Sequence, residues 1–274
     1  DEAVDATYAR HLRLTKPPGS LGRLEAIGAQ LAGIASESPP TLPRPSAAAV
    51  FAGDNGVHAQ GVSPWPQEVT TQMVANFLAG GAAINVLAHQ VGADVVVVDV
   101  GIVGDVAATG ARTGDAASIV GGDGAPASRL IDRKVRRGTA DLATGPAMTV
   151  DEARRALDAG AEAAALLVDG GARCLVTGDM GIANTTPSSA LIASLTDRPA
   201  AAVTGRGTGI DDHLLTRKTA LVAAAAARAR YEPGTDALAI LAEVGGLEHA
   251  ALAGFVVGAA ALQVPVVVDG VIAA

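Results

Sequence analysis

Short apolar runs alternate along the chain with longer segments in which apolar residues recur every three or four positions. The runs are rich in Val, Ala or Leu, and most of them end beside glycine or aspartate, which predicts buried strands. They are residues 47–52, 94–100, 173–177, 201–203 and 264–268. Residues 103–149 are richer in Gly and Ala, and we expect loops with one short strand there.

The segments between these runs have the spacing of helices. Leu24, Ile27, Leu31 and Ile34 fall on one face of a helix over residues 21–35, with Ser20 as its N-cap. A short helix ends near residue 14, before Lys16-Pro17-Pro18. We expect further helices over residues 66–78, 82–91, 149–168, 188–195, 211–231, 235–242 and 247–262.

Strands that alternate with helices predict an α/β fold, with a parallel sheet and right-handed crossovers. A Pro- and Ser-rich linker over residues 36–45 separates the first helices from the first strand. In such sheets, ligands bind beyond the carboxyl ends of the strands. Here the expected strand ends carry glycine, and most also carry an acid: Gly53-Asp54, Asp99 with Gly101, Gly178-Asp179, Gly205-Arg206 and Asp269-Gly270. We therefore expect the active site at this edge.

Composition narrows the function classes. A net charge of −8 over 274 residues argues against a nucleic-acid partner, which needs a basic face. No segment reaches the roughly 18 uninterrupted apolar residues of a membrane span, and we expect a cytoplasmic protein. Cys174, the only cysteine, is expected to be a small core residue. Because the chain starts at Asp1 without an initiator Met, we expect an incomplete N-terminus.

Metal chemistry is not indicated by the histidines. None of them has HxH, HxxxH or HExxH spacing, so we expect no zinc or iron site. They are His11, His58, His89, His213 and His249.

The segment 178–187, GDMGIANTTP, is the most informative motif. It follows a β-branched run, carries Asp179, and opens a helix with Asn184, Thr185 and Thr186. Backbone N–H groups and hydroxyls at a helix N-terminus form a cradle for an anion such as phosphate. The alternative is a tight strand–helix connection in which Thr185 or Thr186 is only an N-cap.

A second glycine-rich turn, TGRGTG at residues 204–209, precedes another expected helix. It matches neither a P-loop nor a dinucleotide-binding fingerprint. Two roles therefore stay open for it: a second phosphate-facing turn, or a purely structural connection. Lys218, farther along that helix, is a candidate anion ligand or a surface lysine. Asp211 and Asp212 fit helix-start carboxylates better than catalytic acids.

Trp65, the only tryptophan, lies on a loop near the end of the first strand. Its indole is placed either to stack on a flat heterocycle or to wedge between Pro64 and Pro66. Farther along, the segment 243–248, EVGGLE, fits a break between two helices, with Glu248 as a first-turn acid.

Several motifs together resemble the nicotinate-nucleotide–dimethylbenzimidazole phosphoribosyltransferase family. They are KPPGSLGRLE at 16–25, the block 54–73, Gly138-Thr139, GPAM at 145–148, the segment 178–187, the segment 205–212, EVGGLE at 243–248 and Asp269-Gly270. These motifs occur in the same order as in the family, over essentially the whole chain. Each motif alone is a weak signal, but the combination is specific.

The resemblance implies a fold, an activity and an assembly. The fold is α/β, a Rossmann-like parallel sheet with helices on both faces, plus a small helical domain. Residues 1–45 would be the N-terminal helical part of the small domain, and residues 46–274 the Rossmann-like catalytic domain. A homodimer would transfer phosphoribose from nicotinate mononucleotide to 5,6-dimethylbenzimidazole in cobalamin nucleotide-loop assembly, giving α-ribazole 5′-phosphate and nicotinate. No metal or organic cofactor is implied.

The resemblance also implies site residues. Those expected to hold the phosphate and ribose are Gly181, Asn184, Thr185, Thr186, Gly205, Gly207, Thr208, Gly209 and Lys218. Trp65, Met73 and Met180 would line the pocket of the benzimidazole base. Asp179 would be a supporting catalytic carboxylate.

Two features depart from the family pattern. Asp179 stands where the family has Glu, and Asn55 stands at a position that is commonly His. Relatives also continue past Asp269-Gly270 with a Ser-His segment that carries the general-base glutamate. We therefore expect the principal base beyond Ala274, in a C-terminal part of the family fold that this chain lacks. Two alternatives stay open: an inactive nucleotide-binding homologue, or a phosphoribosyltransferase for another nitrogen base.

Overall fold

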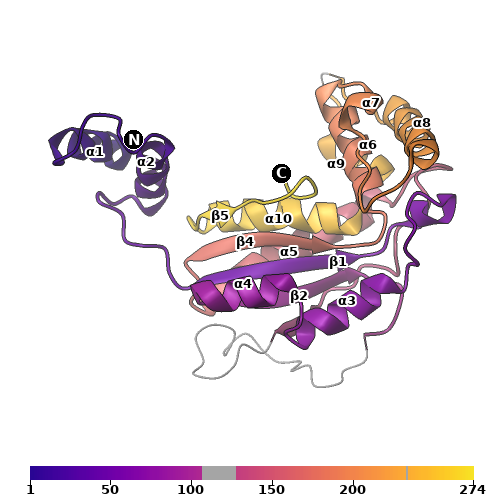
Figure 1. Ribbon diagram of the computed structural model, residues 1–274, viewed down its shortest axis with the longest axis horizontal. Helices are drawn as coiled ribbons and strands as arrows, with labels where there is room; N and C mark the ends of the chain where they lie inside the picture. The colour runs from indigo at the N-terminus through magenta and orange to yellow at the C-terminus, as the bar shows by residue number, and fades with distance from the viewer. Residues whose placement is uncertain (107–127, 233) are drawn as a thin grey trace.

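A five-stranded, fully parallel sheet forms the centre of the protein, in the order β3-β2-β1-β4-β5. The structure, a computed structural model, describes residues 1–106, 128–232 and 234–274 (Figure 1). The strands are β1 (Ser46–Gly53), β2 (Ala93–Gly101), β3 (Arg129–Asp132), β4 (Cys174–Met180) and β5 (Val266–Val267). This arrangement confirms the predicted α/β class.

Helices cover both faces of the sheet (Figure 1). In chain order, the helices are α1 (Glu2–Arg13), α2 (Arg23–Ala35), α3 (Val69–Leu78), α4 (Ala83–Val91), α5 (Val150–Asp169), α6 (Thr185–Thr196), α7 (Ala200–Val203), α8 (Asp212–Arg228), α9 (Ala237–Val244) and α10 (Leu247–Ala261), with a short 3₁₀ turn, η1 (Gly56–Gln60). Side chains of β1 alternate between the two faces. Ala49 and Phe51 enter the core beneath α5 and α10, whereas Val50 and Ala52 enter the core beneath α3 and α4.

The run at residues 201–203 is not a strand, contrary to the prediction. It forms the one-turn helix α7, which begins after Pro199 and contains three alanines before Val203. Alanine is the best helix former and proline is favoured at helix starts, so local propensity outweighs a single β-branched residue. The short strand expected within residues 103–149 is β3, and residues 107–127 of that segment lie outside the described residues.

Glycines bring α5 and α10 unusually close together. A methyl group on Gly160 of α5 would lie 1.8 Å from the carbonyl oxygen of Ala251, and one on Gly254 of α10 would lie 1.8 Å from that of Leu157. The two helix backbones therefore touch directly, which fixes the position of α10 over the sheet.

Residues 69–91 are long and apolar enough, by length and composition, to cross a membrane. In the structure this stretch comprises α3 and α4, which are separated by a turn with Gly80 at φ 79°. Both helices contribute side chains to the core on one face of the sheet.

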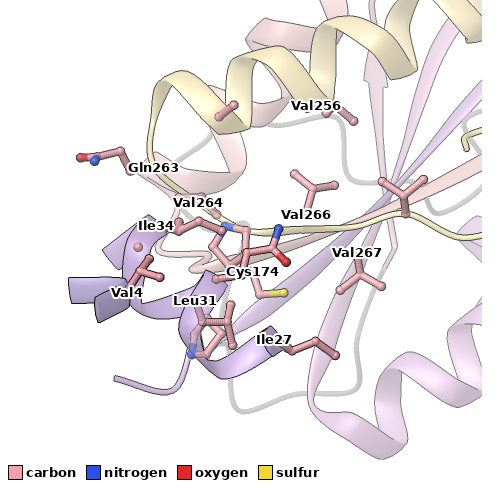
Figure 2. A pocket seen from close by; sticks show the side chains of 16 residues that line it. Val4, Ile27, Leu31, Ile34, Cys174, Val256, Gln263, Val264, Val266 and Val267 are labelled. Carbon is pink, nitrogen blue, oxygen red and sulfur yellow. The ribbon is translucent and has the colours of Figure 1, made fainter. Parts of the chain in front are cut away.

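An apolar hollow of about 810 Å³ lies between the N-terminal helices and β5 (Figure 2). Ile27 and Leu31 of α2 line one wall, and Val266 and Val267 line the other. Cys174, the first residue of β4, also lines the hollow and is partly exposed, so the prediction of a core cysteine is wrong. The hollow lies near the amino end of β4, away from the edge where ligands of such sheets bind.

Candidate active site

The strand order reverses between β1 and β4, since β2 follows β1 on one side and β5 follows β4 on the other. Crevices at such a switch point bind ligands. Asp179 on β4 stands beside Phe51 on β1. Past the strand ends, a Cβ on Gly181 would lie 2.2 Å from the carbonyl oxygen of Gly53, so only glycine fits there. The two strand ends therefore converge on one small region.

Lys218 is a buried cation in this region. Its side chain is 1% exposed, and its Nζ donates hydrogen bonds to Thr185 Oγ1 at 2.7 Å and to the carbonyl oxygen of Gly205 at 3.2 Å. Burial lowers the pKa of Lys218 to about 8. Among the described residues no carboxylate forms an ion pair with it, although Lys218 carries its charge at neutral pH. An anionic ligand would supply the missing negative charge.

A pocket of about 50 Å³ opens beside Lys218, between the start of α6 and the turn before α8. Six of the predicted nucleotide-binding residues line it: Gly181, Asn184, Thr185, Gly207, Thr208 and Lys218. Gly207 has φ 54°, and a Cβ there would lie 3.2 Å from Thr185 Oγ1 and 3.7 Å from Lys218 Nζ. The glycine-rich turn thus closes directly over the ammonium.

The other three predicted nucleotide-binding residues are placed differently. Gly205 contacts Lys218 through its carbonyl group. Thr186 is fully buried, and its hydroxyl has no hydrogen-bond partner. Gly209, at φ 99°, ends the exposed turn just before Asp211. Asp211 accepts a hydrogen bond from the backbone of Leu214 at 2.8 Å, which confirms its interpretation as a helix-start carboxylate.

The first turn of α6 has no side-chain cap. The N-cap residue is Asn184, rather than either threonine, and it makes no capping hydrogen bond. Its Nδ2 instead donates to Asp179 Oδ2 at 2.6 Å. Ala183, just before it, has φ 72°, a left-handed conformation that non-glycine residues rarely adopt and that is often found at functional sites. The positive dipole end of α6, at Asn184 and Thr185, therefore borders the pocket.

Asp179 occupies the last part of β4, half-buried beside this turn. Burial, and after it the negative charge of Glu248, raise its pKa to about 6, although His249 and the amide of Asn184 act in the opposite direction. The carboxyl group is thus ionised at neutral pH, yet it takes up a proton far more readily than an ordinary aspartate does.

Glu248, His249 and Asn55 were missed as site residues by the sequence analysis. Glu248 is a first-turn acid of α10, as predicted, but it is fully buried at the strand ends, where Asn55 Nδ2 donates to its Oε1 at 2.8 Å. The signal was an acid beside a histidine in an otherwise apolar helix, preceded by two glycines. A Cβ on Gly246 would lie 2.5 Å from Glu248 Oε1, and one on Gly53 would lie 2.9 Å from Oε2.

The three predicted base-pocket residues are only partly grouped. Met73 on α3 and Met180 at the end of β4 both pack against the core on the same face of the sheet. Thr70 of α3 accepts a hydrogen bond from the backbone of Ile182 at 3.1 Å, which ties this helix to the turn after Met180. Trp65 is 50% exposed on its loop, and its carbonyl oxygen lies 2.8 Å from His58 Nε2.

Within the described part of the chain, no three His, Cys, Asp or Glu side chains are arranged to hold a metal ion.

Comparisons with known proteins agree with this arrangement. The model of a phosphoribosyltransferase family, DBI_PRT, matches residues 1–274. The chain is 55% identical over 274 residues to a nicotinate-nucleotide–dimethylbenzimidazole phosphoribosyltransferase of Salinispora tropica, covering 100% of this chain and 74% of that protein. A protein of the same name from Chloroflexus aurantiacus is 50% identical over 273 residues, covering 100% of this chain and 72% of that protein.

A solved structure extends the likeness to three dimensions. The crystal structure of CobT from Thermus thermophilus matches with a TM-score of 0.87 at 45% sequence identity, covering 100% of this chain and 76% of that one. At 45% identity, the two proteins are similar in sequence as well as in fold. The chain therefore belongs to the DBI_PRT family of phosphoribosyltransferases.

Proposed function

We propose that the protein transfers phosphoribose from nicotinate mononucleotide to 5,6-dimethylbenzimidazole. The products would be nicotinate and α-ribazole 5′-phosphate, a building block of the cobalamin nucleotide loop. The names of the relatives support the substrates. The single observation that supports them best is Lys218, a buried cation without an ion-pair partner among the described residues, beside a pocket of about 50 Å³.

In the proposed reaction the nucleotide phosphate binds against Lys218, Thr185 and the start of α6. A nitrogen lone pair of the benzimidazole attacks the anomeric carbon from the face opposite nicotinate. As the new C–N bond forms, the bond to nicotinate breaks and its electron pair leaves with the ring. The linkage inverts from β to α, and the attacking ring is left with one excess proton. Holding both rings in line across the ribose supplies most of the catalytic advantage in such a displacement.

Asp179 is proposed to assist the transfer of that proton. Its carboxyl group, with a pKa of about 6, is ionised at neutral pH and is a better acceptor than an ordinary aspartate. The Asn184 amide fixes its orientation at 2.6 Å. The principal glutamate base expected beyond Ala274 stays a prediction.

The assembly is proposed to be a cytoplasmic homodimer, with residues 1–45 in a small helical domain. Exposed apolar side chains on α2 and next to β5, such as Leu24, Ile27 and Val268, support burial against further protein. Sedimentation velocity at micromolar concentration would give the mass of a dimer, and a monomer across that range would contradict the proposal.

A coupled assay tests the reaction. The full-length protein should release nicotinate from nicotinate mononucleotide only when a benzimidazole is present, and Lys218→Met should abolish the release at low nucleotide concentration. Release that requires a different nitrogen base would identify a phosphoribosyltransferase for that base. Nucleotide binding without release under any base would identify an inactive binding homologue and refute the transfer.

A further inference from the structure

The loop that carries Trp65 reaches the pocket beside Lys218 through Ser63. Ser63 lines this pocket of about 50 Å³ together with Thr185 of α6 and Lys218 of α8. The sequence analysis gave Ser63 no role. Because the pocket is so small, an atom bound in it lies near every wall. Ser63 is therefore a candidate contact for the same anion that would complement the charge of Lys218.

The hydroxyl group of Ser63 accepts one hydrogen bond and has its own hydrogen to give. Its Oγ accepts from the backbone N–H of Trp65 at 3.2 Å. No acceptor among the described residues receives the hydroxyl hydrogen. A serine hydroxyl can donate one hydrogen bond while it accepts another. An anion in the pocket can thus accept from Ser63 while the bond between Ser63 and the Trp65 backbone stays intact.

Two hydrogen bonds that share one hydroxyl group strengthen each other. Donation to a charged phosphate oxygen polarises the O–H bond, which makes Ser63 Oγ a better acceptor for the N–H of Trp65. At 3.2 Å the existing bond to Trp65 is at the long end of the usual range, so it has room to shorten. A bound phosphate would therefore tighten the turn between Ser63 and Trp65.

Both ends of the Trp65 loop are attached to the turn that precedes α6. At the first end, Val62 is buried in the same apolar cluster as Ala183. At the second end, Thr70 Oγ1 accepts from the backbone of Ile182 at 3.1 Å. The stretch between these two anchors, with Trp65 at its centre, is largely exposed. The position of the indole therefore depends on contacts within the loop, and the contact with Ser63 is the one that borders the pocket.

We propose that Ser63 is a positioning residue that couples the two halves of the active site. It donates to the nucleotide phosphate and, through the Trp65 backbone, fixes the wall against which the base binds. Bound nucleotide then raises the affinity for the benzimidazole, and by thermodynamic linkage the base raises the affinity for the nucleotide by the same factor. The inference rests on the proposed function, which supplies both ligands. Ser63 acts on binding, since its hydroxyl is placed at the phosphate and not at the anomeric carbon.

Calorimetric titrations of the full-length protein test the coupling. Ribose 5-phosphate is the probe, because it carries the phosphate but no nicotinate, so no transfer occurs. In the wild-type protein, saturating ribose 5-phosphate should lower the Kd of 5,6-dimethylbenzimidazole by about fivefold. In Ser63→Ala, the affinity for ribose 5-phosphate should fall about tenfold, the usual effect of losing a hydrogen bond to a charged group. At saturation it should then leave the Kd of the base unchanged.

Ser38→Ala is the matched control. Ser38 is also a half-buried serine before a proline, its one hydrogen bond joins it to Thr7 Oγ1 at 2.8 Å, and it does not line the pocket. Both affinities should equal those of the wild-type protein. Undiminished ribose 5-phosphate affinity in Ser63→Ala would overturn the proposal. A merely structural role would weaken base binding equally with and without ribose 5-phosphate, and that result would overturn it too.

The nicotinate-release assay gives a second readout. In Ser63→Ala the KM values of both substrates should rise while kcat changes little, because binding is affected and the chemical step is not. A kcat that falls as far as kcat/KM would overturn the positioning role. If no base supports release although both ligands strengthen each other's binding, the transfer fails and the coupling stands. If release occurs but the wild-type protein shows no such enhancement, the transfer stands and the coupling fails.

Discussion

The ammonium group of Lys218 lies 2.7 Å from the hydroxyl of Thr185, and this contact joins the middle of α8 to the first turn of α6. It places a positive charge at the positive end of a helix dipole, an arrangement that is unfavourable in the empty protein. A dianionic phosphate would interact favourably with both. The site therefore keeps a charge imbalance that a ligand would correct.

Replacing Lys218 with methionine should weaken binding of nicotinate mononucleotide by about 1.5–3 kcal/mol, the usual worth of a hydrogen bond to a charged group. Isothermal titration calorimetry measures this directly. Arg217→Met is the matched control, because the neighbouring residue is exposed. Equal losses of nucleotide affinity in the two variants would show that Lys218 does not bind the nucleotide.

The stability of the empty protein should rise with pH above neutrality. The pKa of Lys218 is about 8 in the folded protein and 10.5 in its ordinary state, so the unfolded chain binds more protons between these values. The free energy of unfolding should therefore increase from about pH 8 to about pH 10.5, relative to Lys218→Met. Urea titrations at several pH values test this, and a pH-independent difference between the two proteins would contradict it.

Gly207→Ala should impair the phosphate site, whereas Gly205→Ala should not. Gly207 has φ 54°, where an alanine costs about 1–2 kcal/mol, and its methyl group would press against Thr185 Oγ1. At Gly205 the backbone is ordinary and nothing lies within 4 Å of the added methyl group. Thermal shifts induced by inorganic phosphate should be reduced only in the first variant.

Asp179→Asn should lower kcat far more than it raises KM for nicotinate mononucleotide, because the amide keeps the shape but cannot accept the proton. The variant should also gain stability relative to the wild-type protein between pH 4 and 6. Since the folded pKa is raised from 3.8 to about 6, the wild-type folded state loses stability as pH rises through that window. An unchanged kcat would show that Asp179 has only a structural role in the turn.

Gly160→Ala should destabilise the protein by about 1–3 kcal/mol through overpacking, since the methyl group would lie 1.8 Å from the Ala251 carbonyl oxygen. Helix propensity alone would favour alanine by about 1 kcal/mol. The sign of the change in the free energy of unfolding therefore shows whether overpacking or helix propensity dominates. Gly145→Ala, with open space around the methyl group, serves as the control in chemical denaturation.

Trp65 should report binding of the base. It is the only tryptophan and is 50% exposed, so a flat ring stacked on it would shift its emission to shorter wavelength or quench it. Saturating 5,6-dimethylbenzimidazole should produce this change, and inorganic phosphate should not. An unaltered spectrum at saturating base would exclude Trp65 from the base pocket.

Local patterns were sufficient to predict most elements. β1 and β2 coincide with the predicted runs to within one residue at each end. α5 begins at a capping box in which Thr149 accepts from the backbone of Glu152 and Glu152 accepts from that of Thr149. Such signals act between near neighbours in sequence and are visible without a structure. The helix α7 was missed because one turn is too short for its period to differ from that of a strand.

The buried part of the candidate site could not be predicted in the same way. Glu248 meets Asn55 across 193 positions of sequence, and no spacing rule connects them. Gly181 is a second example. Its motif predicted that it faces the phosphate, but not its contact with β1. The structure adds a second reason for this glycine, the carbonyl oxygen of Gly53 that excludes any side chain.

Asn184 turns its amide toward Asp179 and leaves the start of α6 without a cap. A missing cap costs a helix about 1 kcal/mol, so the first turn of α6 should open more readily than the rest of the helix while the site is empty. A bound phosphate would complete the helix as well as fill the pocket. Phosphate binding and the order of the first turn of α6 are then thermodynamically coupled. Amide hydrogen exchange at Thr186 and Ser188, with and without phosphate, would measure this coupling.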